Sequence, residues 1–380
     1  MSQSQGGIYV HIPYCRQACV YCDFHFMTNL RNKAEMLEAM AWEAKEHRNF
    51  FGGQFPLGTL YFGGGTPSVL SPEELETFLV VLRENYTFAE GVEVTLEANP
   101  DDLDLHYLQA IRALGINRLS IGVQSFRAAD LQWMNRSHTA EQALSCITDA
   151  QKTGFDNISI DLIFGLPDSD ISIWQSQLEQ AAALGVTHLS LYALTVEERT
   201  ALAHQVKQGQ TRIPDDPLFT EQFLFAHEKL EAAGYEHYEL SNYAKPGYRS
   251  QHNSAYWQGK PYLGIGPSAH SFDGQTRHWN IAHNQKYIQA FREAASPIAE
   301  SETLSVKDRY HEYIMTQVRK KEGIDMQHIE AEFVTNWQAL FGPYIGELMA
   351  EGLMTRKENW LALTPLGWML SDEITRELFV

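Results

Sequence analysis

Short apolar runs alternate with amphipathic stretches along the first two thirds of the chain. Six runs have the continuous hydrophobic and β-branched character of buried strands, at residues 8–12, 59–62, 92–97, 118–122, 157–163 and 188–192. Strands that alternate with helices predict a parallel sheet covered by helices. Six such units predict an α/β fold with an incomplete (β/α)6 barrel rather than a closed eightfold one, and function at the carboxyl ends of its strands.

Two of the intervening helices have clear end signals. Ser71 followed by Pro72 predicts a helix start, and Leu75 and Phe78 begin its apolar stripe. Gly115, directly after an apolar helical run, predicts the end of another helix. These signals support a helix between successive strands.

The pattern changes after residue 245, and we predict three parts with boundaries at 1–245, 246–303 and 304–380. The middle part is rich in glycine, aromatic and polar residues, which is typical of functional loops and connectors. The last part is mostly helical and reads as a helix, Gly352, a short hairpin and a final helix. That order predicts a winged-helix-like domain.

The charge balance argues against nucleic acid as a partner. The formal net charge is −19, and from Leu304 onward twelve acidic residues outnumber eight Lys and Arg, which would repel phosphates. No run of eighteen apolar residues predicts a membrane span, and residues 1–7 lack an apolar signal segment. We therefore expect a cytoplasmic protein with reduced thiols.

Three of the four cysteines, Cys15, Cys19 and Cys22, lie together in "HIPYCRQACVYCDFHF". Unrelated core cysteines rarely crowd so closely, whereas Cys146 alone in an amphipathic helix is typical of packing. Structural zinc normally needs four ligands, which His11 or His25 would have to complete. An iron–sulfur cluster takes thiolates as its usual ligands, and three thiolates leave one iron of a [4Fe–4S] cluster open to a substrate or cofactor.

Glycine and polar residues recur at or after the ends of the predicted strands. Glycines in "YFGGGTP" would let backbone groups approach a ligand closely, although a tight turn would also explain them. Glu97 offers an acceptor, and Arg136 offers a guanidinium fork that suits a carboxylate. These positions would converge on one edge of the sheet, as an active site on a β/α scaffold does: Gly64, Gly65, Thr66, Glu97, Gln124, Arg136 and Asp161.

The C-x3-C-x2-C spacing resembles the signature of the radical S-adenosylmethionine (SAM) superfamily. That resemblance implies a [4Fe–4S] cluster on Cys15, Cys19 and Cys22, with SAM on the open iron. The other motifs resemble the oxygen-independent coproporphyrinogen oxidase family and its relatives, from Tyr9 to about Phe272 and in the C-terminal domain. By that resemblance the SAM pocket consists of Tyr9, Tyr21, Gly64, Gly65, Thr66, Glu97, Gln124, Arg136, Asp161 and Ala193.

Two departures separate this chain from the true oxidases. Phe24 stands where their motif has a fourth cysteine, and only eight residues precede Tyr9. Both features resemble the HemW-type haem chaperones, which also carry H-N-x-x-Y-W; this chain has "HNSAYW", His252 to Trp257. Histidine is a common haem ligand and the aromatic rings suit a porphyrin, although a purely structural loop is the alternative. The predicted haem residues are His252, Tyr256, Trp257 and His270.

We therefore predict a chaperone that binds haem as cargo and delivers it to apo-haemoproteins. The resemblance implies that these acceptors are respiratory enzymes. The alternative is a radical SAM oxidase or decarboxylase of a tetrapyrrole, and a weaker one is a zinc-stabilised winged-helix protein. The scaffold is that of an enzyme, but we expect no coproporphyrinogen oxidase activity. A reductant for the cluster would be a further partner, and the resemblance leaves a homodimer and peripheral membrane contact open.

Overall fold

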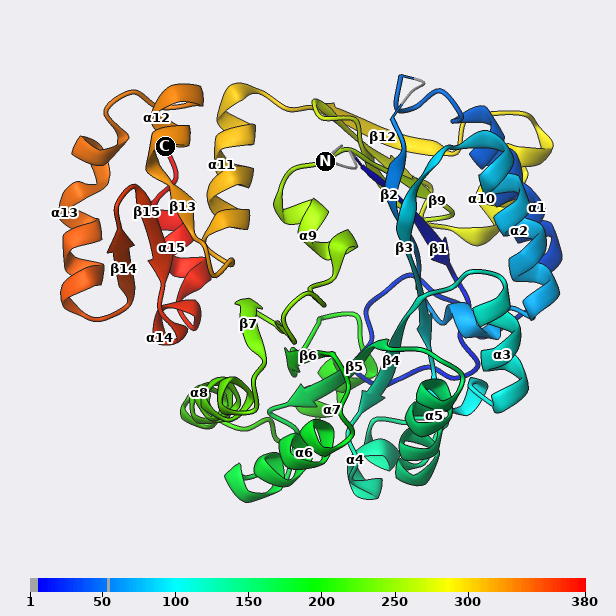
Figure 1. The fold of residues 1–380 in the computed structure, drawn as a ribbon, viewed down its shortest axis with the longest axis horizontal. Coiled ribbons are helices and arrows are strands. Elements are labelled where there is room, and N and C mark those ends of the chain that lie inside the picture. The colour runs from blue at the N-terminus through cyan, green and yellow to red at the C-terminus, as the bar shows by residue number, and fades with distance from the viewer. Residues whose placement is uncertain (1–5, 53–54) are drawn as a thin grey trace.

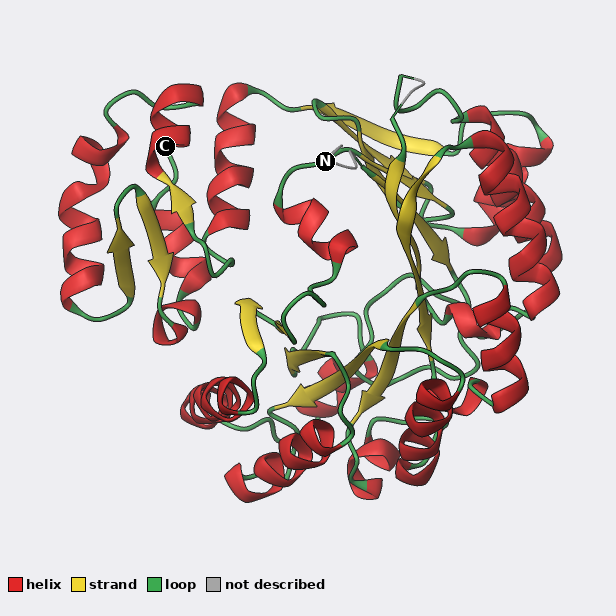
Figure 2. Cartoon of the chain, viewed as in Figure 1, coloured by secondary structure: helices red, strands yellow, loops and turns green. Residues whose placement is uncertain are grey.

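The computed structural model describes residues 6–52 and 55–380, and its centre is one curled twelve-stranded sheet (Figure 1). Helices cover the outer face of this sheet, and a smaller module stands beside it (Figure 2). The strand order from edge to edge is β12-β11-β10-β9-β1-β2-β3-β4-β5-β6-β8-β7.

Six consecutive parallel strands form the middle of the sheet and contain all six predicted strand segments. Their interior side chains are nearly all buried, which accounts for the continuous apolar runs in the sequence. Because they are parallel and sequential, their carboxyl ends lie at one edge of the sheet. The strands are β1 (Gly7–Ile12), β2 (Leu57–Gly64), β3 (Phe88–Ala98), β4 (Arg118–Gln124), β5 (Asn157–Phe164) and β6 (His188–Ala193).

The helices between and after these strands begin and end largely as the sequence predicts. Ser71 caps the second helix, accepting from the Glu74 backbone N–H while the Glu74 carboxylate accepts from Ser71 N. Gly115, with φ of +96°, follows the third helix. The helices are α1 (Lys33–Glu46), α2 (Pro72–Asn85), α3 (Leu105–Ala113), α4 (Ala128–Trp133), α5 (Ala140–Lys152), α6 (Ile171–Ala183), α7 (Ala201–Lys207) and α8 (Asp216–Ala232).

The segment 246–303 differs from the expected loop and connector. It forms two helices and four strands, and its strands extend the barrel sheet beside β1. Its glycines permit close packing: a Cβ on Gly264 would lie 2.1 Å from the carbonyl oxygen of His270. These elements are α9 (Gln251–Trp257), β9 (Tyr262–Ile265), β10 (His270–Phe272), β11 (Thr276–Asn280), α10 (Asn284–Arg292) and β12 (Ile298–Thr303). The opposite edge holds β7 (Glu236–Glu239) and β8 (Asn242–Ala244).

The C-terminal module has the predicted helix, glycine, hairpin and helix order. Gly352, with φ of +73°, ends the long helix before a β14–β15 hairpin, and β13 pairs with β15. The elements are α11 (Val306–Gln317), β13 (Ile324–Asp325), α12 (Met326–Glu332), α13 (Trp337–Ala350), β14 (Met354–Lys357), β15 (Trp360–Leu363), α14 (Pro365–Trp368) and α15 (Ser371–Glu377).

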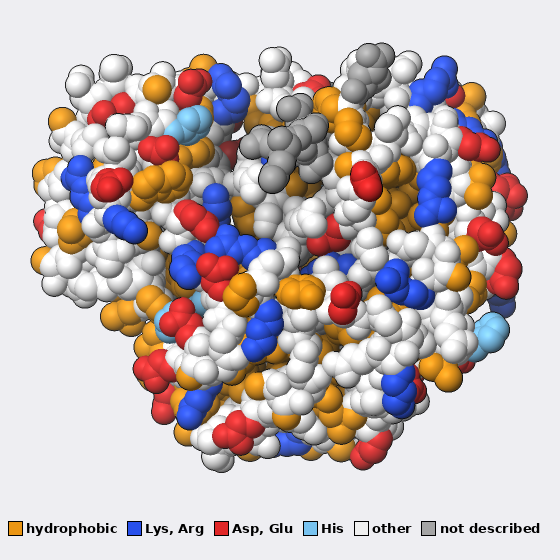
Figure 3. Space-filling view, viewed as in Figure 1, with side chains coloured by type: hydrophobic (Ala, Val, Ile, Leu, Met, Phe, Trp, Pro, Cys, Tyr) orange, Lys and Arg blue, Asp and Glu red, His pale blue; other side chains and the backbone are white. Residues whose placement is uncertain are grey.

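The module is joined to the barrel by charged and aromatic contacts. Arg249 pairs with Glu236 at 2.7 Å and with Glu322 at 2.8 Å, and Lys321 also reaches Glu236. Figure 3 shows Lys and Arg side chains gathered between the two parts on this face, among scattered acidic groups. Within residues 6–52 and 55–380 we find no helix with the length and apolar character needed to span a bilayer.

Candidate functional site

A cavity of about 640 Å³ opens at the carboxyl ends of the barrel strands. It brings together nearly every predicted cluster and SAM residue from segments far apart in the sequence. Those that line it are Cys15, Cys19, Tyr21, Cys22, Gly64, Gly65, Thr66, Glu97, Gln124, Arg136, Asp161 and Ala193. The expected convergence at one sheet edge is therefore present in the structure.

The cysteine loop that follows β1 is tied down at several points. Cys15 N donates to Met27 O, and Met27 N donates to Pro13 O, both at 3.0 Å, which closes the loop at its base. Val20 N donates to Met134 O at 3.1 Å, which fixes the loop's middle to the segment after α4. The three thiols thus face the cavity from a loop whose backbone is held by the barrel.

The glycines of "YFGGGTP" allow the cysteine loop to pass close to β2. A Cβ on Gly65 would lie 2.6 Å from Tyr14 O, and one on Gly64 would lie 2.8 Å from the His11 ring. Gly65 N donates to Ile12 O at 2.8 Å, and the Thr66 hydroxyl donates to Cys15 Sγ at 3.3 Å. A side chain at either glycine would displace the loop that carries the thiols.

Arg136 joins the cysteines to the neighbouring strands. Its guanidinium donates to Cys19 Sγ at 3.3 Å, to Asn99 Oδ1 at 2.6 Å and to the Gly122 carbonyl at 2.8 Å. Its Nε is buried without a partner. The guanidinium therefore brings a positive charge to the thiols and keeps one donor unused beside the cavity.

Two buried carboxyls face the cavity from β3 and β5. Burial raises the pKa of Glu97 to about 7 and that of Asp161 to about 6. Glu97 accepts from the Tyr61 hydroxyl at 2.7 Å and from Gly64 N at 3.2 Å, whereas Asp161 Oδ1 is buried without a partner. Both groups have carboxylate oxygens suited to hydroxyl or cationic donors of a ligand.

Tyr9 differs from the other predicted SAM residues, because it is not among the residues that line the cavity. Its ring stacks 6.1 Å from Tyr61, and its hydroxyl lies 3.2 Å from His11 Nδ1. Sequence reasoning in turn missed Asn99, which lines the cavity and accepts from Arg136. The alternation of side chains along β3 could have found it, since it stands two positions after Glu97.

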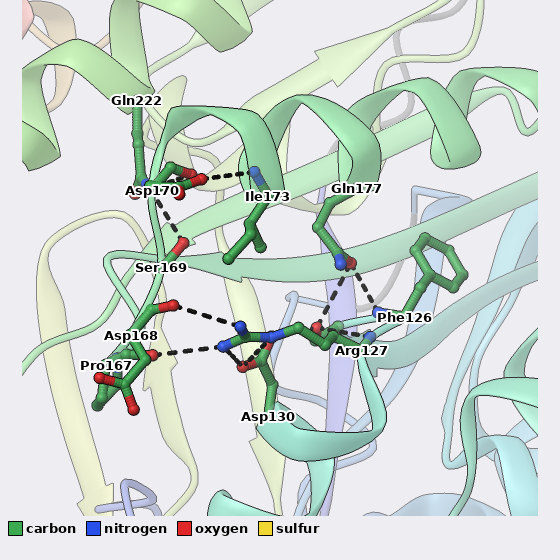
Figure 4. A network of polar contacts seen from close by, with 11 residues as sticks. Phe126, Arg127, Asp130, Pro167, Asp168, Ser169, Asp170, Ile173, Gln177 and Gln222 are labelled. Carbon is green, nitrogen blue, oxygen red and sulfur yellow. Dashed lines mark hydrogen bonds and ion pairs between the residues drawn. The ribbon is translucent and has the colours of Figure 1, made fainter.

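A polar network holds the turn that follows Gln124, the last residue of β4. Figure 4 shows how this network connects the turn to the loop after β5 and to helices α6 and α8. Gln124 has a φ of +64°, a strained value for a residue other than glycine. Directly after it, Phe126 N donates to Gln177 Oε1 at 2.7 Å, and Arg127 Nε donates to Asp130 Oδ1 at 2.8 Å. Arg127 also reaches the Asp168 carbonyl at 3.3 Å, which ties this turn to the loop after β5.

The "HNSAYW" segment forms α9, and His252 lies deep inside the barrel. The residue is 3 % exposed, and its ring has Nδ1 2.8 Å from the Thr59 hydroxyl and Nε2 2.9 Å from the Tyr256 hydroxyl. Burial lowers its pKa to about 3, so the imidazole is neutral at pH 7. Both ring nitrogens are therefore engaged within the protein. Trp257, at the end of α9, has its carbonyl bound by Gln317 of α11 at 2.9 Å.

His270 is placed quite differently. It is exposed at the start of β10, with its ring 5.7 Å from Trp279. Its backbone carbonyl lies against Gly264 of β9, which pairs in parallel with β1. His270 therefore lies toward the carboxyl end of β1, the end of the barrel that carries the cysteine loop. Phe24, 73 % exposed, stands at the mouth of the cavity.

The cavity suits a thiolate-bound cluster with a polar ligand beside it. Burial raises the pKa of Cys15 to about 12, so thiolates here require the compensating charge of a metal centre. Among the described residues, no three His, Cys, Asp or Glu side chains stand close enough to hold a single metal ion. Three thiols on one cavity wall nevertheless suit a multi-iron cluster, in which each thiolate binds a different iron. The unpaired Asp161 Oδ1 and Arg136 Nε add buried polar atoms suited to a second ligand.

Comparisons with known proteins match both parts of the chain. The model of the radical SAM superfamily matches residues 9–179, and that of the HemN C-terminal domain matches residues 304–370. The heme chaperone HemW of Mycobacterium tuberculosis (strain ATCC 25618 / H37Rv) is 34 % identical over 387 residues, covering 98 % of this chain and 94 % of the relative. That of Bacillus subtilis (strain 168) is 32 % identical over 373 residues, covering 96 % and 97 %.

A mitochondrial protein and a solved structure extend the comparison. The radical S-adenosyl methionine domain-containing protein 1 of Danio rerio is 32 % identical over 391 residues, covering 97 % of this chain and 86 % of the relative. The structure of coproporphyrinogen III oxidase (HemN) from Escherichia coli, a radical SAM enzyme, superposes with a TM-score of 0.83 at 24 % identity. It covers 99 % of this chain and 90 % of that one, which shows a shared fold.

Proposed function

This chain belongs to the family of the haem chaperone HemW, within the radical SAM superfamily, and we propose that it binds haem and delivers it to apo-haemoproteins. The observation that carries the proposal is nearly full-length similarity to HemW proteins from several bacteria, and the thiol-lined cavity of this chain supports it. The proposal has two further parts. The haem acceptors are respiratory haemoproteins, and a separate reductant supplies electrons to the cluster.

Radical SAM membership implies a [4Fe–4S] cluster and SAM, and the residues of the cavity fit both. We propose Cys15, Cys19 and Cys22 as the cluster ligands, with Arg136 and Glu97 among the residues that hold SAM. In this superfamily the bound cluster supplies one-electron chemistry to SAM. The chain's own contribution is to orient the thiols through the Thr66 and Arg136 contacts and to keep the carboxyls in a shielded pocket.

For the haem-iron ligand, the geometry favours His270 over His252. His270 is exposed beside the aromatic ring of Trp279, and it lies at the same end of the barrel as the exposed ring of Phe24. An accessible imidazole next to apolar ring surface is what haem binding requires. His252 would have to leave the Thr59 and Tyr256 hydroxyls and the barrel interior before it could reach iron.

Haem titration of single variants tests this proposal. The parent protein should bind haem with a defined absorption spectrum, and His270→Ala should weaken binding or change the spectrum because it removes the accessible imidazole. His278→Ala, in the neighbouring strand β11, is the matched control and should behave like the parent. Absence of haem binding by the parent would overturn the chaperone proposal, whereas a normal His270→Ala spectrum would overturn only the ligand assignment.

The alternative function, oxidation of a tetrapyrrole, has the shared fold with the oxidase HemN in its favour. Phe24 at the cavity mouth, where the oxidases have a further cysteine, counts against it. Anaerobic incubation of the reconstituted protein with SAM, a reductant and coproporphyrinogen should yield no protoporphyrinogen. Several turnovers per protein molecule would favour the oxidase instead.

A further inference from the structure

An unbroken chain of contacts joins α9 to the cavity wall. The ring of His252 stacks on that of Tyr61 with centroids 4.8 Å apart and planes at 23°. The Tyr61 hydroxyl donates to Glu97 Oε1 at 2.7 Å, and the other carboxylate oxygen accepts from Gly64 N at 3.2 Å. The buried histidine therefore lies one aromatic ring away from a carboxylate that lines the cavity.

The histidine itself is fixed from several elements. Thr59 of β2 and Tyr256 of α9 occupy its two ring nitrogens, and the Glu93 carboxylate of β3 accepts from its backbone N–H at 3.1 Å. Tyr61 is also held in place. It is 8 % exposed, its ring packs against His252, and its hydroxyl donates to Glu97. Because the two rings are closely packed, each limits the rotamers of the other. Loss of one ring therefore changes the conformations open to its neighbour.

We propose that His252 is a positioning residue for the cofactor pocket, which fixes the Glu97 carboxylate through Tyr61. This gives the "HNSAYW" segment a task at the SAM site, separate from any contact with haem. The inference rests on the proposed SAM site but not on haem binding. It also accounts for a buried, neutral histidine whose nitrogens both contact protein hydroxyls, which is a poor arrangement for a metal ligand.

Anaerobic calorimetry of SAM binding to the cluster-reconstituted protein tests the proposal. Tyr61→Phe removes only the hydroxyl that Glu97 accepts from, and His252→Ala removes the ring that holds Tyr61. Each should weaken SAM binding by about fivefold, the factor for one hydrogen bond of about 1 kcal/mol. Because both substitutions act through Glu97, the double variant should bind SAM no more weakly than the single variant with the lower SAM affinity. Gln251→Ala, exposed on the same helix, is the control and should bind SAM normally.

Two further measurements separate positioning from general damage. In the parent, SAM addition should change the electron paramagnetic resonance signal of the reduced cluster, and in both variants the same change should need a higher SAM concentration. Haem titration of both variants should match that of the parent. Normal SAM affinity in Tyr61→Phe would overturn the proposal, even if His252→Ala fails to fold. Loss of haem but not SAM binding in His252→Ala would overturn it as well, and would return His252 to the haem site. Failure of the parent to bind haem would defeat the chaperone function alone.

Discussion

At the residue scale, we predict that Glu97 makes SAM binding dependent on pH. Burial and the nearby Asp161 raise its pKa to about 7, against the lowering effects of Tyr61, Gly64 N and Arg118. The carboxyl is therefore largely protonated at pH 6 and largely ionised at pH 8, and only the ionised form accepts with both oxygens. We expect calorimetric SAM affinity to rise between these pH values in the parent and to be weaker and flatter in Glu97→Gln. A parent profile that is flat would contradict this role.

The same shift has a consequence for stability. A carboxyl whose pKa is higher in the folded protein than in the unfolded chain binds its proton more tightly when folded, so its contribution falls as pH rises from about 4.5 to about 7. Glu97→Gln has no carboxyl to ionise. The free energy of unfolding of this variant should therefore lack the fall between pH 5 and pH 8 that Glu97 contributes in the parent. Denaturant unfolding at the two pH values measures this.

The cysteines offer the most direct test of the cluster. Replacing Cys15, Cys19 and Cys22 together by Ala should abolish bound iron and sulfide after anaerobic reconstitution, because the variant loses all three thiolates. Cys146→Ala is the control, since its thiol is buried in α5 and donates to the Ala143 carbonyl at 3.2 Å. A triple variant that retained a full complement of iron and sulfide would show that the cluster lies elsewhere.

Sequence reasoning located the residues that a local motif marks, but it did not give the surroundings of residues that distant contacts define. The cysteine spacing, and the positions of Glu97 and Asp161 in the carboxyl-terminal halves of their strands, can be read directly from motif and periodicity. His252 could not be interpreted in this way, because the Thr59 hydroxyl that binds it is 193 positions away. The sequence around an isolated histidine and its aromatic neighbours is the same whether the histidine contacts haem or packs inside the barrel.

At the scale of elements, the network in Figure 4 determines the shape of the turn after β4. Asp130, with its side chain 5 % exposed, is paired with Arg127 and accepts from the Ser125 hydroxyl at 2.7 Å. Arg127→Ala would leave a buried carboxylate without its cation, and we expect the free energy of unfolding to fall by about 3–5 kcal/mol. Denaturant titration followed by circular dichroism would measure the loss.

Lys152→Ala is the matched control for this pair. Lys152 and Asp149 have the same spacing of three residues on a neighbouring helix, but their side chains are 64 % and 33 % exposed. An exposed pair contributes about 0.2–1 kcal/mol, so the control should be nearly neutral. Equal losses in the two variants would show that burial of Asp130 does not govern the stability of the turn.

The predictability of elements followed the same division between local and distant contacts. The six parallel strands are buried on both faces, so their continuous apolar runs identify them. The segment 246–303 was expected to be loop because it is rich in glycine, aromatic and polar residues, whereas it forms the short strands β9–β12. Gly264 of β9 is required by the close approach of β10, a tertiary contact that composition alone does not reveal.

At the scale of the whole molecule, the C-terminal module meets the barrel through aromatic rings. Trp368 of α14 is 4 % exposed and lies 4.4 Å, centroid to centroid, from His237 of β7, which in turn stacks 3.9 Å from Tyr243 of β8. The Trp368 indole also donates to the Val318 carbonyl at 3.1 Å, just after α11. One side chain therefore contacts the edge of the barrel sheet and the first helix of the module, so the two parts should respond together to its loss.

We expect Trp368→Ala to lower the free energy of unfolding by about 3–5 kcal/mol, the range for truncating a buried aromatic side chain. Hydrogen exchange should also quicken in β7 and β8, because they lose the ring that covers His237. Trp360→Ala, in the same module but 41 % exposed on β15, should change stability by no more than about 0.5 kcal/mol. If Trp368→Ala speeds exchange only within the module and leaves β7 and β8 protected, the two parts are stabilised independently, and the contact at His237 does not couple them.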